Sequence, residues 1–119
     1  MRTLTALLLA LALGCGPDPL PPLTFTPALL PGATVGQAYL GTIAISDNQT
    51  PIAGVWVSTG SLPPGLTVGV ALPLTRNEIQ VTGTPSAADT FQFTLRVGCF
   101  GTNRPGQVGE QAYSLLVAP

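Results

Sequence analysis

The chain has 119 residues, enough for one domain, and only 8% of them are charged, against a usual share of about 25%. Its formal net charge is −1, and it contains no Lys and no His. Four scattered arginines exclude the clustered basic surface that nucleic-acid binding needs. The missing residue types also exclude Ser-His-Asp triads, His-based metal sites and lysine Schiff bases.

The first fourteen residues have the three parts of an export signal. Arg2 supplies a positive charge, residues 4–13 form an unbroken run of Leu, Ala and Thr, and a small residue, Gly14, follows. The run is about half as long as the roughly 20 apolar residues of a transmembrane helix. We therefore expect residues 1–14 to be a signal peptide that is removed.

The exit of this segment, Leu11-Ala12-Leu13-Gly14-Cys15, resembles the lipobox of bacterial lipoproteins, although Ala12 stands where that motif usually has Leu. The resemblance implies that Cys15 becomes the first residue and carries fatty acyl chains such as palmitate, so that the membrane is a partner through the lipid anchor. Because Gly16 and not Asp follows Cys15, it also implies a place in the cell envelope at the outer membrane. The alternative is cleavage after Ala12, an A-x-A site, which would give a secreted domain in which Cys15 and Cys99 can form a disulfide. If Cys15 is acylated, Cys99 is left as a small, semi-buried hydrophobic residue.

Residues 15–22 then contain the acylated Cys and a tether, and residues 23–119 form the body of the protein. The tether GPDPLPP has four prolines in seven residues. It is expected to be extended at about 3.1 Å per residue, which gives a length of roughly 20 Å.

From residue 23 onward, apolar and polar residues alternate with a period of two. The pattern predicts strands at residues 39–46, 52–58, 79–81, 91–97 and 113–117, with Trp56 as a core anchor. Turns are expected at Asp47-Asn48 and at Pro64-Gly65, where Gly65 takes the positive-φ position of a type II turn, and Pro85 should end a strand. Short strands between turns, with no helical stretch, indicate an all-β sandwich or barrel.

Three segments carry a specific resemblance: residues 58–68 (STGSLPPGLTV), 79–85 (IQVTGTP) and 91–97 (FQFTLRV). They look like the immunoglobulin-like domains of bacterial surface proteins, a family related to the cadherin-like domains of dystroglycan. The resemblance covers about residues 22–118 and implies an Ig-like Greek-key β-sandwich of about seven strands, usually non-catalytic. The aromatic strand of the family often ends in Val-Thr-Asp, whose Asp supports calcium in cadherin-like relatives, but here it reads Val97-Gly98-Cys99. We therefore expect no metal and no other cofactor.

The loops between the second and third, fourth and fifth, and sixth and seventh strands of an Ig-like sandwich share one end. We expect five charged residues to gather at that end as a candidate ligand-facing cluster: Asp47, Arg76, Glu78, Arg104 and Glu110. Asp89 should lie at the opposite end. The ordinary alternative is that these charges only solvate loop tips.

A pair of these carboxylates is the one ordinary route to hydrolysis that the composition leaves, so a carbohydrate-active protein is the less favoured alternative. We expect no catalytic residues and no enzyme. The sequence favours a binding, adhesion or structural module of the cell envelope, with an envelope protein or polysaccharide as its further partner.

Overall fold

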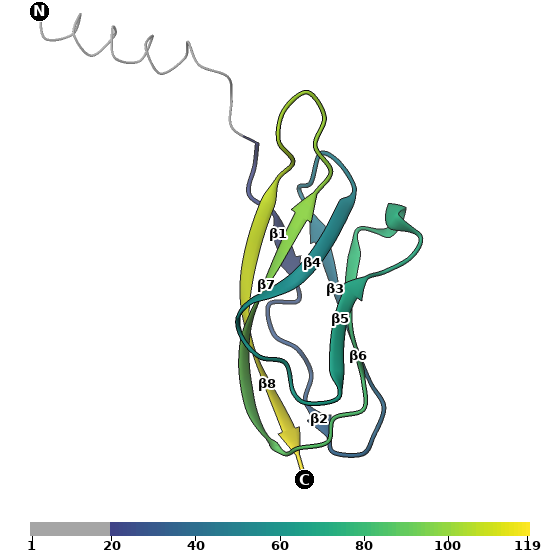
Figure 1. The fold of residues 1–119 in the computed structure, drawn as a ribbon, viewed down its shortest axis with the longest axis vertical. Helices are drawn as coiled ribbons and strands as arrows, with labels where there is room; N and C mark the ends of the chain where they lie inside the picture. Colours follow the sequence, from purple (N-terminus) through teal and green to yellow (C-terminus); the bar gives the residue numbers. More distant parts are fainter. Residues whose placement is uncertain (1–19) are drawn as a thin grey trace, which may run out of the picture.

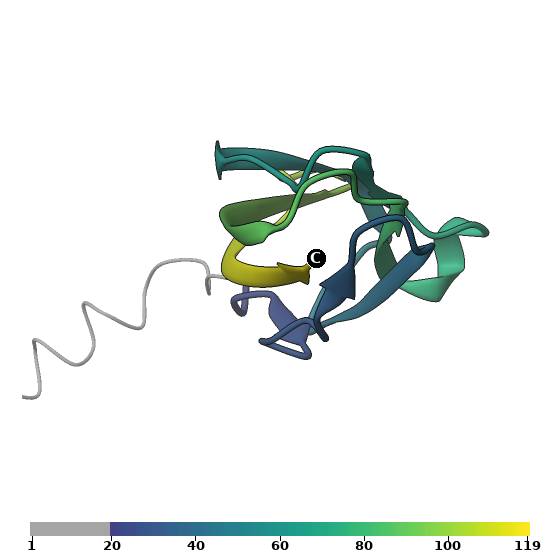
Figure 2. The same cartoon turned by 90° about the horizontal axis from the view of Figure 1, so that it is seen from below.

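The computed structural model describes residues 20–119, which form two four-stranded β-sheets packed face to face (Figures 1 and 2). One sheet contains, in spatial order, β1 (Thr24–Thr26), β3 (Tyr39–Ser46), β6 (Glu78–Gly83) and β5 (Leu66–Val70). The other contains β2 (Ala33–Thr34), β8 (Val108–Ala118), β7 (Asp89–Cys99) and β4 (Ile52–Gly60). The only helix in residues 20–119 is the 3₁₀ turn η1 (Leu74–Arg76), and no helix there is long and apolar enough to cross a membrane.

This strand order is that of an immunoglobulin-like Greek-key sandwich, which confirms the predicted fold class. Residues 20–119 contain eight strands because the first strand of the sandwich is divided between the sheets: β1 pairs antiparallel with β3, and β2 pairs parallel with β8. Pro27 and Pro31 lie in the break. A proline cannot donate to a ladder, so a continuous strand is not possible there.

The period-two pattern places one side of each strand in a single core between the sheets. The strands predicted around residues 39–46, 79–81, 91–97 and 113–117 are confirmed as β3, β6, β7 and β8. Within the core the rings of Phe93 and Tyr113 stack, with centroids 6.1 Å apart. The Tyr113 hydroxyl donates a hydrogen bond to the Pro27 carbonyl oxygen at 2.8 Å, so burial of this polar group is compensated.

The prediction that Trp56 anchors the core is wrong: this residue is 46% exposed. Ile52 pairs with Cys99 and Gly54 with Gly98, so Ala53 is an extra residue that bulges out of the ladder. The bulge shifts the alternation by one residue. Val55 and Val57 then face the core, and Trp56 faces solvent on the outer side of the sheet.

The two most characteristic motifs pack against each other. The amide of Leu66 donates to the Pro63 carbonyl oxygen at 3.0 Å, and Gly65 has a φ of 95°, which confirms the predicted turn at Pro64-Gly65. Leu66 pairs with Gly83, and β6 ends there before Pro85, as expected. Asp47 has a φ of 66°, in keeping with the reversal expected after β3.

Candidate functional site

The loops β3–β4, β5–β6 and β7–β8 lie at one end of the sandwich, where the described chain also begins, and the C-terminus lies at the other end (Figure 1). Gln107, a residue that is only 8% exposed, connects the segments at this end through its side chain. Its Nε2 donates to the Pro21 and Asp47 carbonyl oxygens at 2.7 and 2.9 Å, and its Oε1 accepts from the Gln49 amide at 2.7 Å. The loop end is therefore a hydrogen-bonded structure that includes the point where the N-terminal segment joins the domain.

Four of the five predicted site residues belong to this loop end. Asp47 follows β3, Arg76 ends η1, Glu78 opens β6, and Arg104 lies between β7 and β8. The Asp47 carboxylate accepts a hydrogen bond from the Thr24 hydroxyl, so it ties β1 to the β3–β4 loop. The hollow at this end, lined in part by Phe100 and Arg104, has a volume of about 60 Å³. That is room for one or two water molecules.

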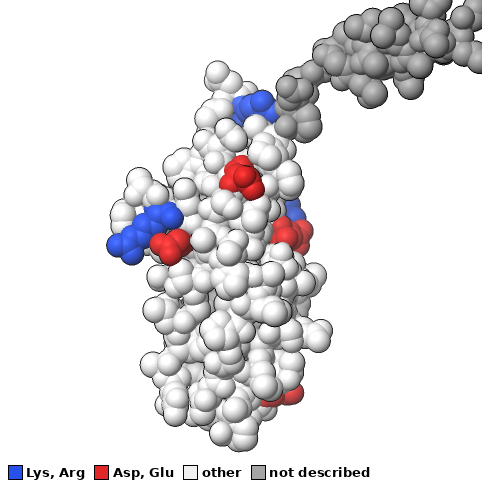
Figure 3. All heavy atoms as spheres, turned by 180° about the vertical axis from the view of Figure 1, so that it is seen from behind, with Lys and Arg blue, Asp and Glu red and all other residues white. Residues whose placement is uncertain are grey.

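Glu110 was predicted to lie in the connection before the last strand, and this is wrong. Strand β8 already begins at Val108, so Glu110 lies within it and pairs with Arg96 of β7. Asp89 opens β7 at the opposite end, as expected. Figure 3 shows charged side chains scattered over one face of the molecule, with wide uncharged areas between them. The five predicted residues thus do not form a single cluster.

A second polar group lies on the outer surface of β4, β7 and β8. Trp56, Arg96 and Glu110 are consecutive partners in the register across these three strands. The Arg96 Nη1 is 2.8 Å from the Glu110 Oε1, and the guanidinium carbon lies 5.9 Å from the centroid of the Trp56 ring. Ser58, the extra residue of a second irregularity in β4, donates its hydroxyl to the Glu110 Oε2 at 2.7 Å. We call the surface with these four residues the Trp56 face.

Stability does not account for this arrangement. The Arg96 and Glu110 side chains are 40% and 42% exposed, and ion pairs at such exposure contribute about 0–1 kcal/mol. Because Trp56 is 46% exposed, hydrophobic stabilisation on the order of 2 kcal/mol that full burial would provide is missing. Exposed aromatic side chains set among ordered polar groups are typical of binding surfaces.

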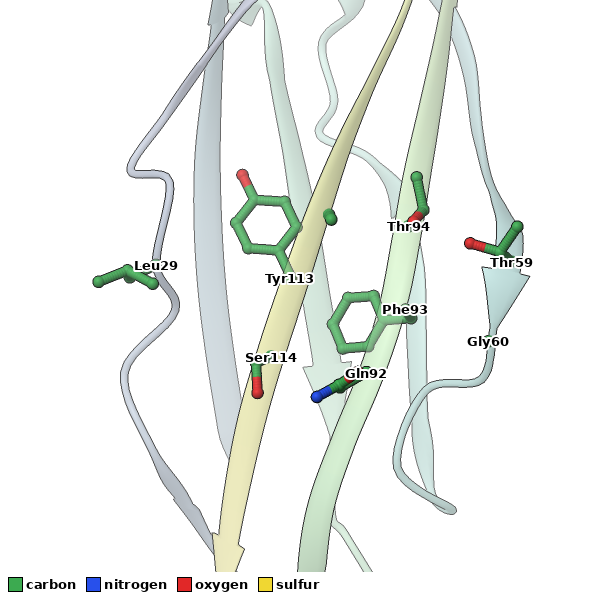
Figure 4. Close-up of a pocket in the computed structure, with 9 residues that line it drawn as sticks. Leu29, Thr59, Gly60, Gln92, Phe93, Thr94, Tyr113 and Ser114 are labelled. Atoms are coloured by element: carbon green, nitrogen blue, oxygen red, sulfur yellow. The ribbon is translucent and has the colours of Figure 1, made fainter.

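A second, larger hollow, with a volume of about 500 Å³, adjoins the Trp56 face through the next residues along β4, β7 and β8. Figure 4 shows residues that line it. Its exposed lining comes from Thr59 of β4, Gln92 of β7, Ala112 and Ser114 of β8, and Leu29. Phe93 and Tyr113 belong to the same strands but turn their rings into the core. The volume falls in the range of about 300–1,000 Å³ that is typical of small-molecule sites.

Sequence reasoning missed the Trp56 face because it assigned Trp56 to the core. A glycine inside a strand pattern is a known sign of a bulge, and Ala53-Gly54 carries that sign. Arg96 also stands between two core residues of the aromatic strand, which marks it as a residue of the outer face.

The acidic residues of the described chain are dispersed. The Asp47 carboxylate is bonded to Thr24 next to one sheet, and the Glu110 carboxylate is bonded to Arg96 and Ser58 on the other. Within residues 20–119, no three His, Cys, Asp or Glu side chains come together in a group that could hold a metal ion.

No family model matches this chain, and no curated protein is similar to it. Among solved structures, the crystal structure of the titin M3 domain is similar, with a TM-score of 0.50 and 19% sequence identity. The alignment covers 82% of this chain and 97% of that domain. At this identity the likeness shows the fold alone. Residues 20–119 therefore form an immunoglobulin-like β-sandwich.

Proposed function

We propose that this protein is a lipid-anchored, non-catalytic binding module of the bacterial cell envelope. The N-terminal segment supports the anchor, because residues 1–15 combine an export signal with a lipobox-like end, and these residues lie outside the described part of the chain. The Ig-like fold supports a binding or structural role. The half-exposed Trp56 beside the Arg96–Glu110 pair favours binding over a purely structural spacer.

The observation that carries the binding role is the half-exposed Trp56 beside the Arg96–Glu110 pair. The hydrogen bond from the Gln107 Nε2 to the Pro21 carbonyl oxygen bears on how an anchored domain would be oriented. It fixes the N-terminal segment to the loop end from Pro21 onward, and Leu23 packs against Gly109. With Cys15 acylated, only residues 16–20 can act as a tether. Five extended residues reach about 16 Å, somewhat less than the seven-residue tether expected from the sequence.

This attachment turns the loop end of the sandwich toward the lipid surface. The loops with Asp47, Arg76, Glu78 and Arg104 then face the membrane, while the Trp56 face looks sideways and the C-terminal end points away. The surface open to an envelope ligand is therefore the outer face of β4, β7 and β8.

Intact-mass analysis of the membrane fraction tests the anchor. We expect a chain that begins at Cys15 and carries added acyl mass, and we expect Cys15→Ser to accumulate as the precursor. The matched control is Cys99→Ser, which removes the other thiol and should mature normally. Soluble protein that begins at Leu13 would contradict the proposal.

The alternative of a secreted domain with a Cys15–Cys99 disulfide has less support. Cys99 ends β7 with only 9% of its surface exposed. Burial raises the pKa of its thiol, which lowers the fraction of thiolate available for disulfide exchange. Cys99 therefore suits the role of a small core residue.

A further inference from the structure

We infer that the Trp56 face and the adjoining hollow bind a neutral polysaccharide chain, with Trp56 as the stacking platform. This assignment deepens the proposed binding role and rests on it. It names a site on the sheet surface and a ligand class, a chain of uncharged sugar rings.

Trp56 is placed as a stacking surface requires. A Cβ atom on Gly98 would lie 3.5 Å from the indole, so the ring is seated against the backbone of β7, at a position without a side chain. Because the indole already rests on a strand, it has little conformational freedom to lose when a ligand stacks on it. A sugar ring presents an apolar surface of C–H groups bordered by hydroxyls, and it therefore matches an aromatic surface bordered by polar groups.

The charges of the Trp56 face favour an uncharged ligand. Arg96 and Glu110 are paired with each other at 2.8 Å, so the face as a whole is neutral. The pair still offers further guanidinium N–H groups and carboxylate lone pairs, which suit hydroxyls as both acceptors and donors. An anionic chain would have to compete with Glu110 for Arg96, whereas a neutral chain leaves the ion pair intact.

The hollow extends this surface along the strands. Two residues from the Arg96–Glu110 pair, on the same side of the sheet, Thr94 of β7 is paired with Ala112 of β8. This second pair lies about 7 Å from the first along the strands, toward the hollow. The next pair, Gln92 and Ser114, lines the hollow as well. An amide, hydroxyls and a small alanine in a row beyond a tryptophan suit a ligand of several linked rings better than a single small molecule.

A protein partner fits this surface less well. The centres of protein interfaces are enriched in Trp and Arg, as in this face, but they are depleted in Glu, Ser and Ala. Those three residue types make up most of the remaining surface, as Glu110, Ser58, Ser114 and Ala112. A second copy of the chain would be an outcome of the test, because β4 is an edge strand of its sheet.

The experiment uses the mature protein, purified from membranes in detergent, in native affinity gels that contain dextran, laminarin, galactomannan or the anionic control alginate. Trp56 is the only Trp of the chain, so its fluorescence reports on this site alone. We expect at least one neutral polysaccharide to retard the protein and shift the Trp emission to shorter wavelength, and alginate to do neither.

Trp56→Ala should weaken retention roughly 10-fold or more, as expected for an aromatic anchor, and Arg96→Ala should also weaken it. The matched control is Phe100→Ala, which truncates an aromatic residue that is also 46% exposed but lies at the loop end. This variant should bind as the wild type does. Circular dichroism and thermal unfolding verify that each variant is folded.

Three results would overturn the inference: no retardation by any of the neutral polysaccharides, equal retardation of wild type and Trp56→Ala, or stronger retardation by alginate. A dimer that becomes a monomer in Trp56→Ala without polysaccharide would assign the face to a second copy instead. The intact mass of the same sample reports whether Cys15 is acylated. The mass therefore tests the anchor proposal and the gels test the polysaccharide site, so that either can fail without the other.

Discussion

Gly83 lies directly against the carbonyl oxygen of Gly65: a Cβ atom on Gly83 would come within 2.1 Å of it. In turn, a Cβ on Gly65 would come within 2.1 Å of the Thr84 carbonyl oxygen. Both glycines have positive φ, 95° at Gly65 and 133° at Gly83. The turn of one sequence motif and the strand end of the other thus approach so closely that only glycine fits at both positions.

Gly83→Ala should therefore lower the free energy of unfolding by about 3 kcal/mol or more, because two backbone segments must move apart. The matched control is Gly36→Ala. Gly36 also has a positive φ, 79°, but a Cβ there would meet nothing within 4 Å, so only the backbone strain of about 1–2 kcal/mol should appear. Urea denaturation measures both, and equal losses would contradict the role of the close approach.

Gln107→Ala should destabilise the protein by about 2–3 kcal/mol, since it leaves the Gln49 amide and two carbonyl oxygens of the loop end without this partner. Gln37→Ala, at an exposed position beyond β2, should change the stability by less than about 0.5 kcal/mol. In Gln107→Ala, hydrogen exchange should also become faster in the β3–β4 loop and near Pro21. Unchanged exchange there would show that Gln107 does not hold the N-terminal segment.

The stability of the domain should fall at alkaline pH because of Tyr113. Burial raises the pKa of Tyr113 from 10.0 to about 12, so the neutral phenol is favoured in the folded state. This contribution is fully present below pH 10 and is lost as the pH rises toward 12, by about 1.4 kcal/mol at pH 11.

Chemical denaturation at pH 8, 10 and 11 measures the effect. Tyr113→Phe should remove most of the fall above pH 10, although it loses the hydrogen bond to Pro27 at every pH. Tyr39→Phe is the comparison variant: burial also raises the pKa of Tyr39, the only other Tyr of the chain, but Tyr39 is less buried, so this variant should remove a smaller part of the fall. A fall of the same size in Tyr113→Phe and in wild type would contradict the assignment.

We propose that the anchored protein resides in the outer membrane, because Gly16 follows Cys15 where inner-membrane lipoproteins commonly have Asp. In a two-membrane host, density-gradient fractionation should recover it with outer-membrane markers, and Gly16→Asp should move it toward the inner membrane. Recovery of the wild type with inner-membrane markers would contradict the sorting proposal and leave the anchor proposal intact.

The sequence by itself determined the fold class. Core positions such as Phe93 and Leu95 alternate with polar residues, and this local pattern specifies a half-buried strand wherever it occurs. The turn at Pro64-Gly65 and the strand end before Pro85 were also predictable. Proline restricts φ to a narrow range and glycine permits positive φ, and both effects act locally, whatever the tertiary context.

Only the tertiary structure decided where the site residues lie. A single extra residue, Ala53, reverses the side of the sheet on which Trp56 is found, and a bulge forms only when the partner strand is in place. The extent of β8 depends in the same way on its pairing with β7, which moved Glu110 from the expected loop to a partner of Arg96. Contacts between strands far apart in the sequence have no local signal, so the Trp56 face emerges only once the sheet is assembled.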